Sequence, residues 1–143
     1  MKLNQISIFL ENREGRLYEA CSLLGEHKIN IRALTIAESD QFGILRVVVD
    51  KPEEAMALLK KNGFTADLTD IVAVEVDDKP GGLAKILKII YDNRINIEYM
   101  YGFVEKSSEK ALLVFRFDDS DKAISVLTDN KIKVIGKKDI VNL

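Results

Sequence analysis

The sequence predicts an α+β protein made of two βαββαβ repeats in tandem, each an antiparallel sheet with its helices on one face. First, the chain matches itself, since LYEACSLLGEHKINI from Leu17 aligns with LAKILKIIYDNRINI from Leu83. Second, apolar residues in each repeat alternate with the strand period and then recur with the helix period. Third, glycines and polar runs separate these segments. The 143 residues leave each unit roughly 70, a marginal size for independent stability, so we expect the units to share an interface.

The first repeat begins with a strand, because Ile6, Ile8 and Leu10 alternate with Ser7 and Phe9. An amphipathic helix follows a polar turn. Its apolar stripe at i, i+3, i+4 and i+7 consists of Leu17, Ala20, Cys21 and Leu24. Two further strands are expected over residues 31–37 and 44–49, and a hairpin turn around Gln41–Gly43 joins them.

The second repeat has the same pattern. Its first strand contains Val72, Val74 and Val76, and the helical stripe that follows consists of Leu83, Ile86, Leu87 and Ile90. Strands are expected over residues 97–104 and 112–117, with the polar run 106–110 as the turn between them. The aligned segments after this turn are shifted by two residues, which indicates a longer loop in the second repeat.

A second helix closes each repeat. In the first repeat Pro52 suits a first helical position and Gly63 suits the helix end, and in the second Ser120 is a plausible N-cap. The faces expected to lie on the sheets consist of Ala55, Met56, Leu58 and Leu59, and of Ala123, Ile124, Val126 and Leu127. Final strands should start near Phe64 and Lys133, and residues 137–143 fit either a strand or a short helix.

The element order βαββαβ is typical of a ferredoxin-like unit. We place the boundary near Thr69, which gives a first unit over residues 1–68 and a second over residues 69–143. Exposed edge strands favour pairing. The two units are therefore expected to pair side by side.

Composition excludes several classes of protein. The net charge is −2 and Lys and Arg are scattered, so nucleic-acid binding is not indicated. The N-terminus lacks the apolar core of a signal peptide, and no apolar run is long enough to span a membrane. With Cys21 as the only cysteine, a reducing, cytoplasmic location is expected. His27 is the only histidine, so we expect no zinc site, no cofactor and no catalytic residue.

Acidic residues offer weaker signals. Asp77 and Asp78 fit a cation site or ordinary turn chemistry. The acidic residues Asp118, Asp119 and Asp121 are interpreted as a solvated helix start. Neither group suggests catalysis.

The turn before the first helix is the polar feature that both repeats keep. It consists of Asn12, Arg13, Glu14 and Gly15 in the first repeat and of Asp78, Lys79, Pro80 and Gly81 in the second. The Asn or Asp could simply cap a helix. Alternatively, the helix N-terminus could hold a ligand carboxylate. The same two readings apply where the second strand begins, at the Asn-Ile pairs Asn30-Ile31 and Asn96-Ile97.

Each repeat has a strand, this polar turn, a helix and then Ile-Asn-Ile at the start of a second strand. This order resembles the ACT-domain family, and its duplication resembles stand-alone bacterial tandem ACT proteins. The resemblance covers nearly the whole chain and departs from the family's usual Pro at Glu14. It implies allosteric regulation of metabolic enzymes by amino acids that bind where ACT units meet. By position it assigns the ligand to both turns and to both Asn-Ile pairs.

We therefore expect a regulatory protein acting in trans that binds a small molecule, with an amino acid as the first candidate. A homodimer or a partner enzyme would complete the system, and no nucleic acid or membrane is involved. Three alternatives remain. They are a pure assembly module, an enzyme on the same fold, and an RNA-binding βαββαβ protein that would use Phe115 and Phe117 on the sheet face.

Overall fold

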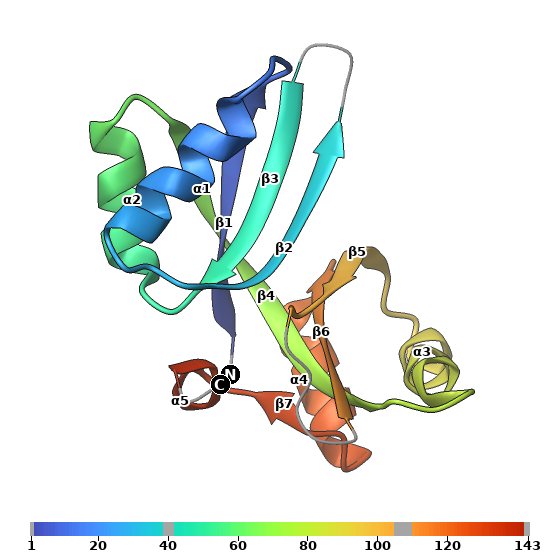
Figure 1. The fold of residues 1–143 in the computed structure, drawn as a ribbon. Helices are drawn as coiled ribbons and strands as arrows, with labels where there is room; N and C mark the ends of the chain where they lie inside the picture. The colour runs from blue at the N-terminus through green and yellow to red at the C-terminus, as the bar shows by residue number, and fades with distance from the viewer. Residues whose placement is uncertain (1, 39–41, 105–109, 142–143) are drawn as a thin grey trace. The chain divides into compact units, whose positions relative to one another are not determined.

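A computed structural model describes residues 2–38, 42–104 and 110–141 (Figure 1). It divides into two compact units, Asn4–Thr69 and Asp70–Leu143, the second of which also takes Met1–Leu3. The division falls inside one strand. Among the described residues no helix is long and apolar enough to cross a membrane.

The first unit has the order strand, helix, strand, strand, helix, strand. Its elements are β1 (Leu3–Glu11), α1 (Arg16–Glu26), β2 (Ile31–Glu38), β3 (Phe42–Val49), α2 (Pro52–Lys61) and the beginning of β4 (Thr65–Asp77). The strand order is β2-β3-β1-β4, which is the ferredoxin-like order. β1 and β3 are antiparallel, with Ile6 opposite Val47, and β2 is an edge strand.

The second unit repeats this order with the end of β4 as its first strand. Its other elements are α3 (Gly82–Asp92), β5 (Ile97–Gly102), β6 (Lys110–Phe117), α4 (Ser120–Asp129), β7 (Val134–Ile135) and α5 (Lys137–Val141). β4 lies between β7 and β6, and β5 is the edge strand beyond β6. The ambiguous C-terminal segment is thus a short helix over its described part. Of the expected hairpin turns, Gln41 and residues 106–109 lie outside the described residues, whereas Phe42 and Gly43 belong to β3 and Lys110 belongs to β6, so those positions were wrongly placed in turns.

One core fills each unit between the helices and one face of the sheet. In the first, Leu24 of α1 and Leu59 of α2 are fully buried against β1 and β3. In the second, Ile90 and Leu127 pack on β4 and β6 in the same way. The predicted stripes are therefore confirmed, with one exception in each repeat. The first residue of each stripe is partly exposed, since Leu17 is 41% exposed and Leu83 is 37% exposed.

Helix ends follow a common pattern. Pro52 occupies the start of α2 as predicted. The residue that caps α4 is Asp119, whose carboxylate accepts from Lys122 N at 3.0 Å, so the prediction of Ser120 was wrong by one position. Gly63 follows α2 with φ 83°, and Lys131 takes the matching left-handed conformation after α4 with φ 61°.

Candidate functional site

The turn between β1 and α1 has the same backbone in both repeats. Arg13 N donates to Glu11 O at 2.8 Å, and Lys79 N donates to Asp77 O at 2.9 Å. Gly15 and Gly81 both have φ 84°, a left-handed conformation that glycine adopts without the strain of a Cβ. Because these glycines occupy the N-cap positions, Asn12 and Asp78 are not the N-caps that the sequence also allowed.

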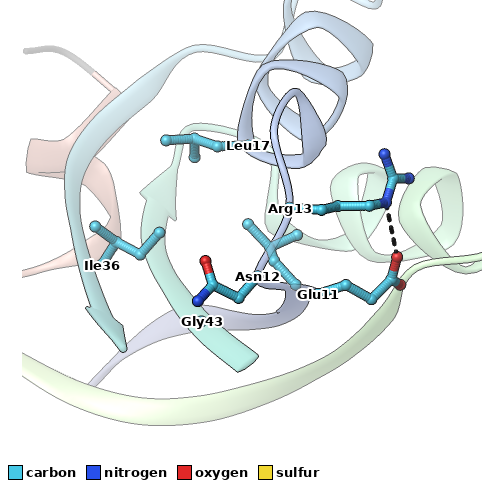
Figure 2. Close-up of a pocket in the computed structure, with 7 residues that line it drawn as sticks. Glu11, Asn12, Arg13, Leu17, Ile36 and Gly43 are labelled. Carbon is cyan, nitrogen blue, oxygen red and sulfur yellow. Dashed lines mark hydrogen bonds and ion pairs between the residues drawn. The ribbon is translucent and has the colours of Figure 1, made fainter. Parts of the chain in front are cut away.

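In the first repeat this turn borders a cavity of about 440 Å³. Figure 2 shows that the lining comes from the turn, the start of α1 and the strands β1, β2 and β3. The lining residues are Leu10, Glu11, Asn12, Arg13, Leu17, Ile36 and Gly43. Glu14 and Gly15 belong to the same turn but do not line the cavity.

Two apolar side chains form one side of the cavity. Leu17 stands in the first turn of α1, and Ile36 lies on β2 and is 52% exposed. Ile36 pairs with Leu45 and therefore faces the helix side of the sheet, yet no helix covers it because β2 is the edge. Sequence periodicity placed Leu17 in the core and did not single out Ile36. An exposed apolar pair beside a polar turn suits the apolar part of a small ligand.

The two arginines beside the cavity are paired with neighbouring carboxylates. Arg13 Nε lies 3.1 Å from Glu11 Oε2, and Arg16 Nη1 lies 2.9 Å from Glu19 Oε2. The hydrogen bond with Glu11 raises the pKa of Arg13, and the hydrogen bond from Arg16 lowers the pKa of Glu19. These two cations and two anions balance one another, and Glu14, which is exposed, adds one negative charge to the turn. An incoming ligand thus meets paired guanidinium groups here.

Asn12 is the polar side chain that remains available. Its amide points into the space beside Ile36, whereas Arg13 and Glu11 point to the other side of the turn (Figure 2). Within residues 2–38, 42–104 and 110–141 the Asn12 side chain makes no hydrogen bond. An amide offers both a donor and an acceptor, so it can bind either polar end of an amino acid.

Asn30 and Ile31 lie at the other end of β2 from this cavity. Asn30 is separated from Ile36 by six residues, or about 20 Å of extended strand. Its backbone is held by Asp50, whose carboxylate accepts from Asn30 N at 3.0 Å and whose N–H donates to Asn30 O at 3.2 Å. Ile31 packs on the core. Within one unit the predicted turn and the predicted asparagine therefore do not meet.

The second repeat shows the same clamp. Asn96 N donates to Asp118 Oδ1 at 3.1 Å, and Asp118 N donates to Asn96 O at 3.1 Å, while Ile97 packs on the second core. Asp118 is exposed at the start of α4, as the sequence indicated, and its carboxylate also holds the backbone of Asn96. The clamp could have been found in the sequence, since an Asp follows the third strand in both repeats. The clamp uses only backbone atoms of Asn30 and Asn96, so it accounts for the fixed start of the strand and not for the asparagine side chain.

The equivalent turn of the second repeat differs in its side chains. Asp78, Lys79, Pro80 and Gly81 are all exposed, and Leu83 stands where Leu17 stands in the first. The position of Ile36 is taken by Gly102, which offers no apolar side chain. The two turns are thus alike in backbone and unlike in the side chains around them.

Other candidate chemistry is not supported by the described residues. They contain no group of three or more His, Cys, Asp or Glu residues placed to hold a metal ion. Burial raises the pKa of the Cys21 thiol, which favours its inert protonated form. Phe115 and Phe117 stack inside the second core with their ring centroids 5.2 Å apart. The aromatic pair that an RNA-binding protein would use is therefore not on an open sheet face.

The chain is built from two ferredoxin-like units, and a cavity borders the first-repeat turn. A family model described as an ACT domain pair matches residues 1–143. The chain therefore belongs to the ACT domain pair family, a regulatory, amino-acid-sensing family, as the resemblance implied. ACT domains are regulatory rather than catalytic.

Solved structures agree with this fold. A protein from Bacteroides thetaiotaomicron is 40% identical, with a TM-score of 0.93 over 100% of this chain and 98% of the other. The regulatory subunit of aspartate kinase from Thermus thermophilus is 18% identical, with a TM-score of 0.63 over 88% of this chain and 91% of the other. The same subunit from Thermus flavus is 19% identical, with a TM-score of 0.57 over 88% and 90%. No functionally curated protein matches the chain.

Proposed function

We propose that this chain is a regulatory protein acting in trans that binds a free amino acid at the turn between β1 and α1. The observation that carries the proposal is the cavity in which the unpaired Asn12 amide faces the exposed Leu17 and Ile36. Its 440 Å³ falls in the range of small-molecule sites, about 300–1,000 Å³. Family membership supports an amino acid as the ligand.

The cavity favours an amino acid with an apolar side chain. Leu17 and Ile36 would contact that side chain, and the first N–H groups of α1, which lack intrahelical acceptors, suit its carboxylate. Acidic amino acids should bind more weakly, because Arg13 and Arg16 are already paired with Glu11 and Glu19. Occupancy then changes the population of forms that a partner enzyme recognises.

A second ACT-like unit, supplied by another copy or by a partner, is part of the proposal. It would cover the exposed edge strand and could bring an asparagine equivalent to Asn30 or Asn96 to the ligand. The second-repeat turn, Asp78–Gly81, is retained as a weaker site of the same kind.

The test is a thermal-shift screen against the proteinogenic amino acids, followed by calorimetry on each hit. A ligand at about 100 times its dissociation constant should stabilise the protein by about 2.7 kcal/mol. Asn12→Ala should weaken binding, and so should Ile36→Ser. Lys88→Gln, a change on the exposed face of α3, is the matched control. Absence of any stabilising amino acid, or full affinity in Asn12→Ala and Ile36→Ser, would refute the proposed site.

A further inference from the structure

A second cavity, of about 200 Å³, lies within the second unit. Its walls come from the first turn of α3, the end of β4, the start of β6 and the segment that joins α4 to β7. Its ionisable residues are Glu75, Asp77, Lys85, Lys110, Lys131 and Lys133. It is distinct from the amino-acid cavity, which belongs to the first repeat.

In the first repeat, side chains of the same unit fill the equivalent space. Arg16 lies with its guanidinium carbon 4.0 Å from the centre of the Phe64 ring, and the same group pairs with Glu19 at 2.9 Å. The backbone shows the equivalence, because Phe64 N donates to Leu59 O just as Ile132 N donates to Leu127 O. An internal cation, an aromatic ring and a carboxylate thus occupy this position in the first unit.

The second repeat has lost each of these groups. Arg16 is replaced by Gly82, Phe64 by Ile132 and Glu19 by Lys85. The glycine is enforced by the backbone, because a Cβ at Gly82 would lie 2.0 Å from Asp77 O. No side chain can therefore grow from this position to fill the cavity, and the residue that balanced the arginine has become a cation.

The remaining charges leave the cavity positive. Lys110 pairs with Asp77, and Lys133 Nζ lies 3.9 Å from Glu75 Oε1. Among the described residues the ammonium groups of Lys85 and Lys131 make no hydrogen bond and no ion pair, and only their backbone N–H groups are bonded. Four lysines and two carboxylates give a net charge of 4 − 2 = +2. The pKa of Asp77 is held below its usual value, mainly by the hydrogen bond from Lys110 and also by Lys79 and Lys85.

We propose that this cavity binds a small oxyanion with two negative charges, which takes the place of the missing internal groups and pairs with Lys85 and Lys131. The cavity is smaller than typical sites for larger ligands, so a compact anion fits it best. Phosphate and short dicarboxylates share the required chemistry. Such an anion would bring the net charge of the cavity to zero, as Glu11 and Glu19 balance Arg13 and Arg16 in the first repeat.

The test is calorimetry of the full chain with inorganic phosphate and, separately, with succinate, at fixed ionic strength in sodium chloride. We expect saturable binding of at least one probe with a stoichiometry of one, and weaker binding as salt rises. The double variant Lys85→Gln/Lys131→Gln should lose affinity by about tenfold or more, because the loss of one hydrogen bond to a charged group already lowers affinity by about tenfold. All its changes are on exposed side chains, so the fold should persist, and circular dichroism verifies it.

Lys88→Gln is the matched control, because Lys88 is on the same helix but pairs with Asp92 at 2.8 Å and does not line the cavity. It should bind the anion like the wild type. The probe that binds identifies the source as a phosphate or a carboxylate, and binding of both supports the shared chemistry. No saturable binding of either probe, or equal affinity in the double variant and Lys88→Gln, would overturn the proposal.

Discussion

Replacing Leu24 by alanine tests the core of the first unit. Leu24 is fully buried in α1 and packs in the cluster formed by the helices and the sheet. The change removes three carbon atoms, which at about 0.8 kcal/mol each correspond to about 2.4 kcal/mol of transfer free energy. The empty volume adds to this, so we expect a loss of about 3–5 kcal/mol.

Leu17→Ala is the matched control, since it removes the same atoms from the same helix. Leu17 is 41% exposed and borders an open cavity, so its truncation leaves no closed void, and we expect a loss of about 1 kcal/mol. Urea unfolding followed by circular dichroism measures both free energies, and an unchanged m-value shows that the unfolded state is unaltered. Equal losses in the two variants would show that the burial of this helix has been misassigned. Leu17→Ala should instead weaken amino-acid binding.

Three further predictions concern single positions. Gly82→Ala should destabilise the protein much more than Gly81→Ala in urea unfolding, because a Cβ at Gly82 meets a backbone oxygen, whereas a Cβ at Gly81 has open space and an alanine there costs only about 1 kcal/mol for its left-handed conformation. Asp119→Ala should cost about 1 kcal/mol through loss of the cap, and Ser120→Ala should cost less, which the same assay compares. The lowered pKa of Glu19 predicts a small stabilisation that is complete above pH 4.5 and is lost as the pH falls through the folded pKa; Glu19→Gln should abolish this part of the pH profile, and an unchanged profile would contradict it.

Periodicity was sufficient to predict both cores, because buried positions on helices and strands follow fixed spacings. It failed at Leu17 and Leu83, where the spacing is helical but the sheet edge leaves the first turn uncovered. It also divided residues 65–77 between two strands, whereas β4 is continuous. No Gly or Pro interrupts this segment, so the sequence already indicated one continuous strand.

The backbone of the turn was predicted, and the side-chain pairings around it were not. A glycine at the same offset in both repeats correctly indicated a special turn, since few residues adopt φ 84°. Pairings across the fold leave no local signal, which is why the Asp50 clamp on Asn30 and the stacking of Arg16 on Phe64 were not foreseen. Contact between Asn30 and a ligand stays a prediction, which calorimetry on Asn30→Ala tests.

The two repeats share a backbone but offer different chemistry at equivalent places. In the first repeat, Arg16 packs on Phe64, pairs with Glu19 and fills the space beside the first helix, while a separate cavity with apolar walls remains beside Asn12. In the second, Gly82 opens that space and lysines surround it. One chain could therefore respond to an amino acid and to an anion. If occupancy of one site alters the affinity of the other, linkage requires the same factor in both directions, so titrating each ligand with the other present measures one coupling free energy twice.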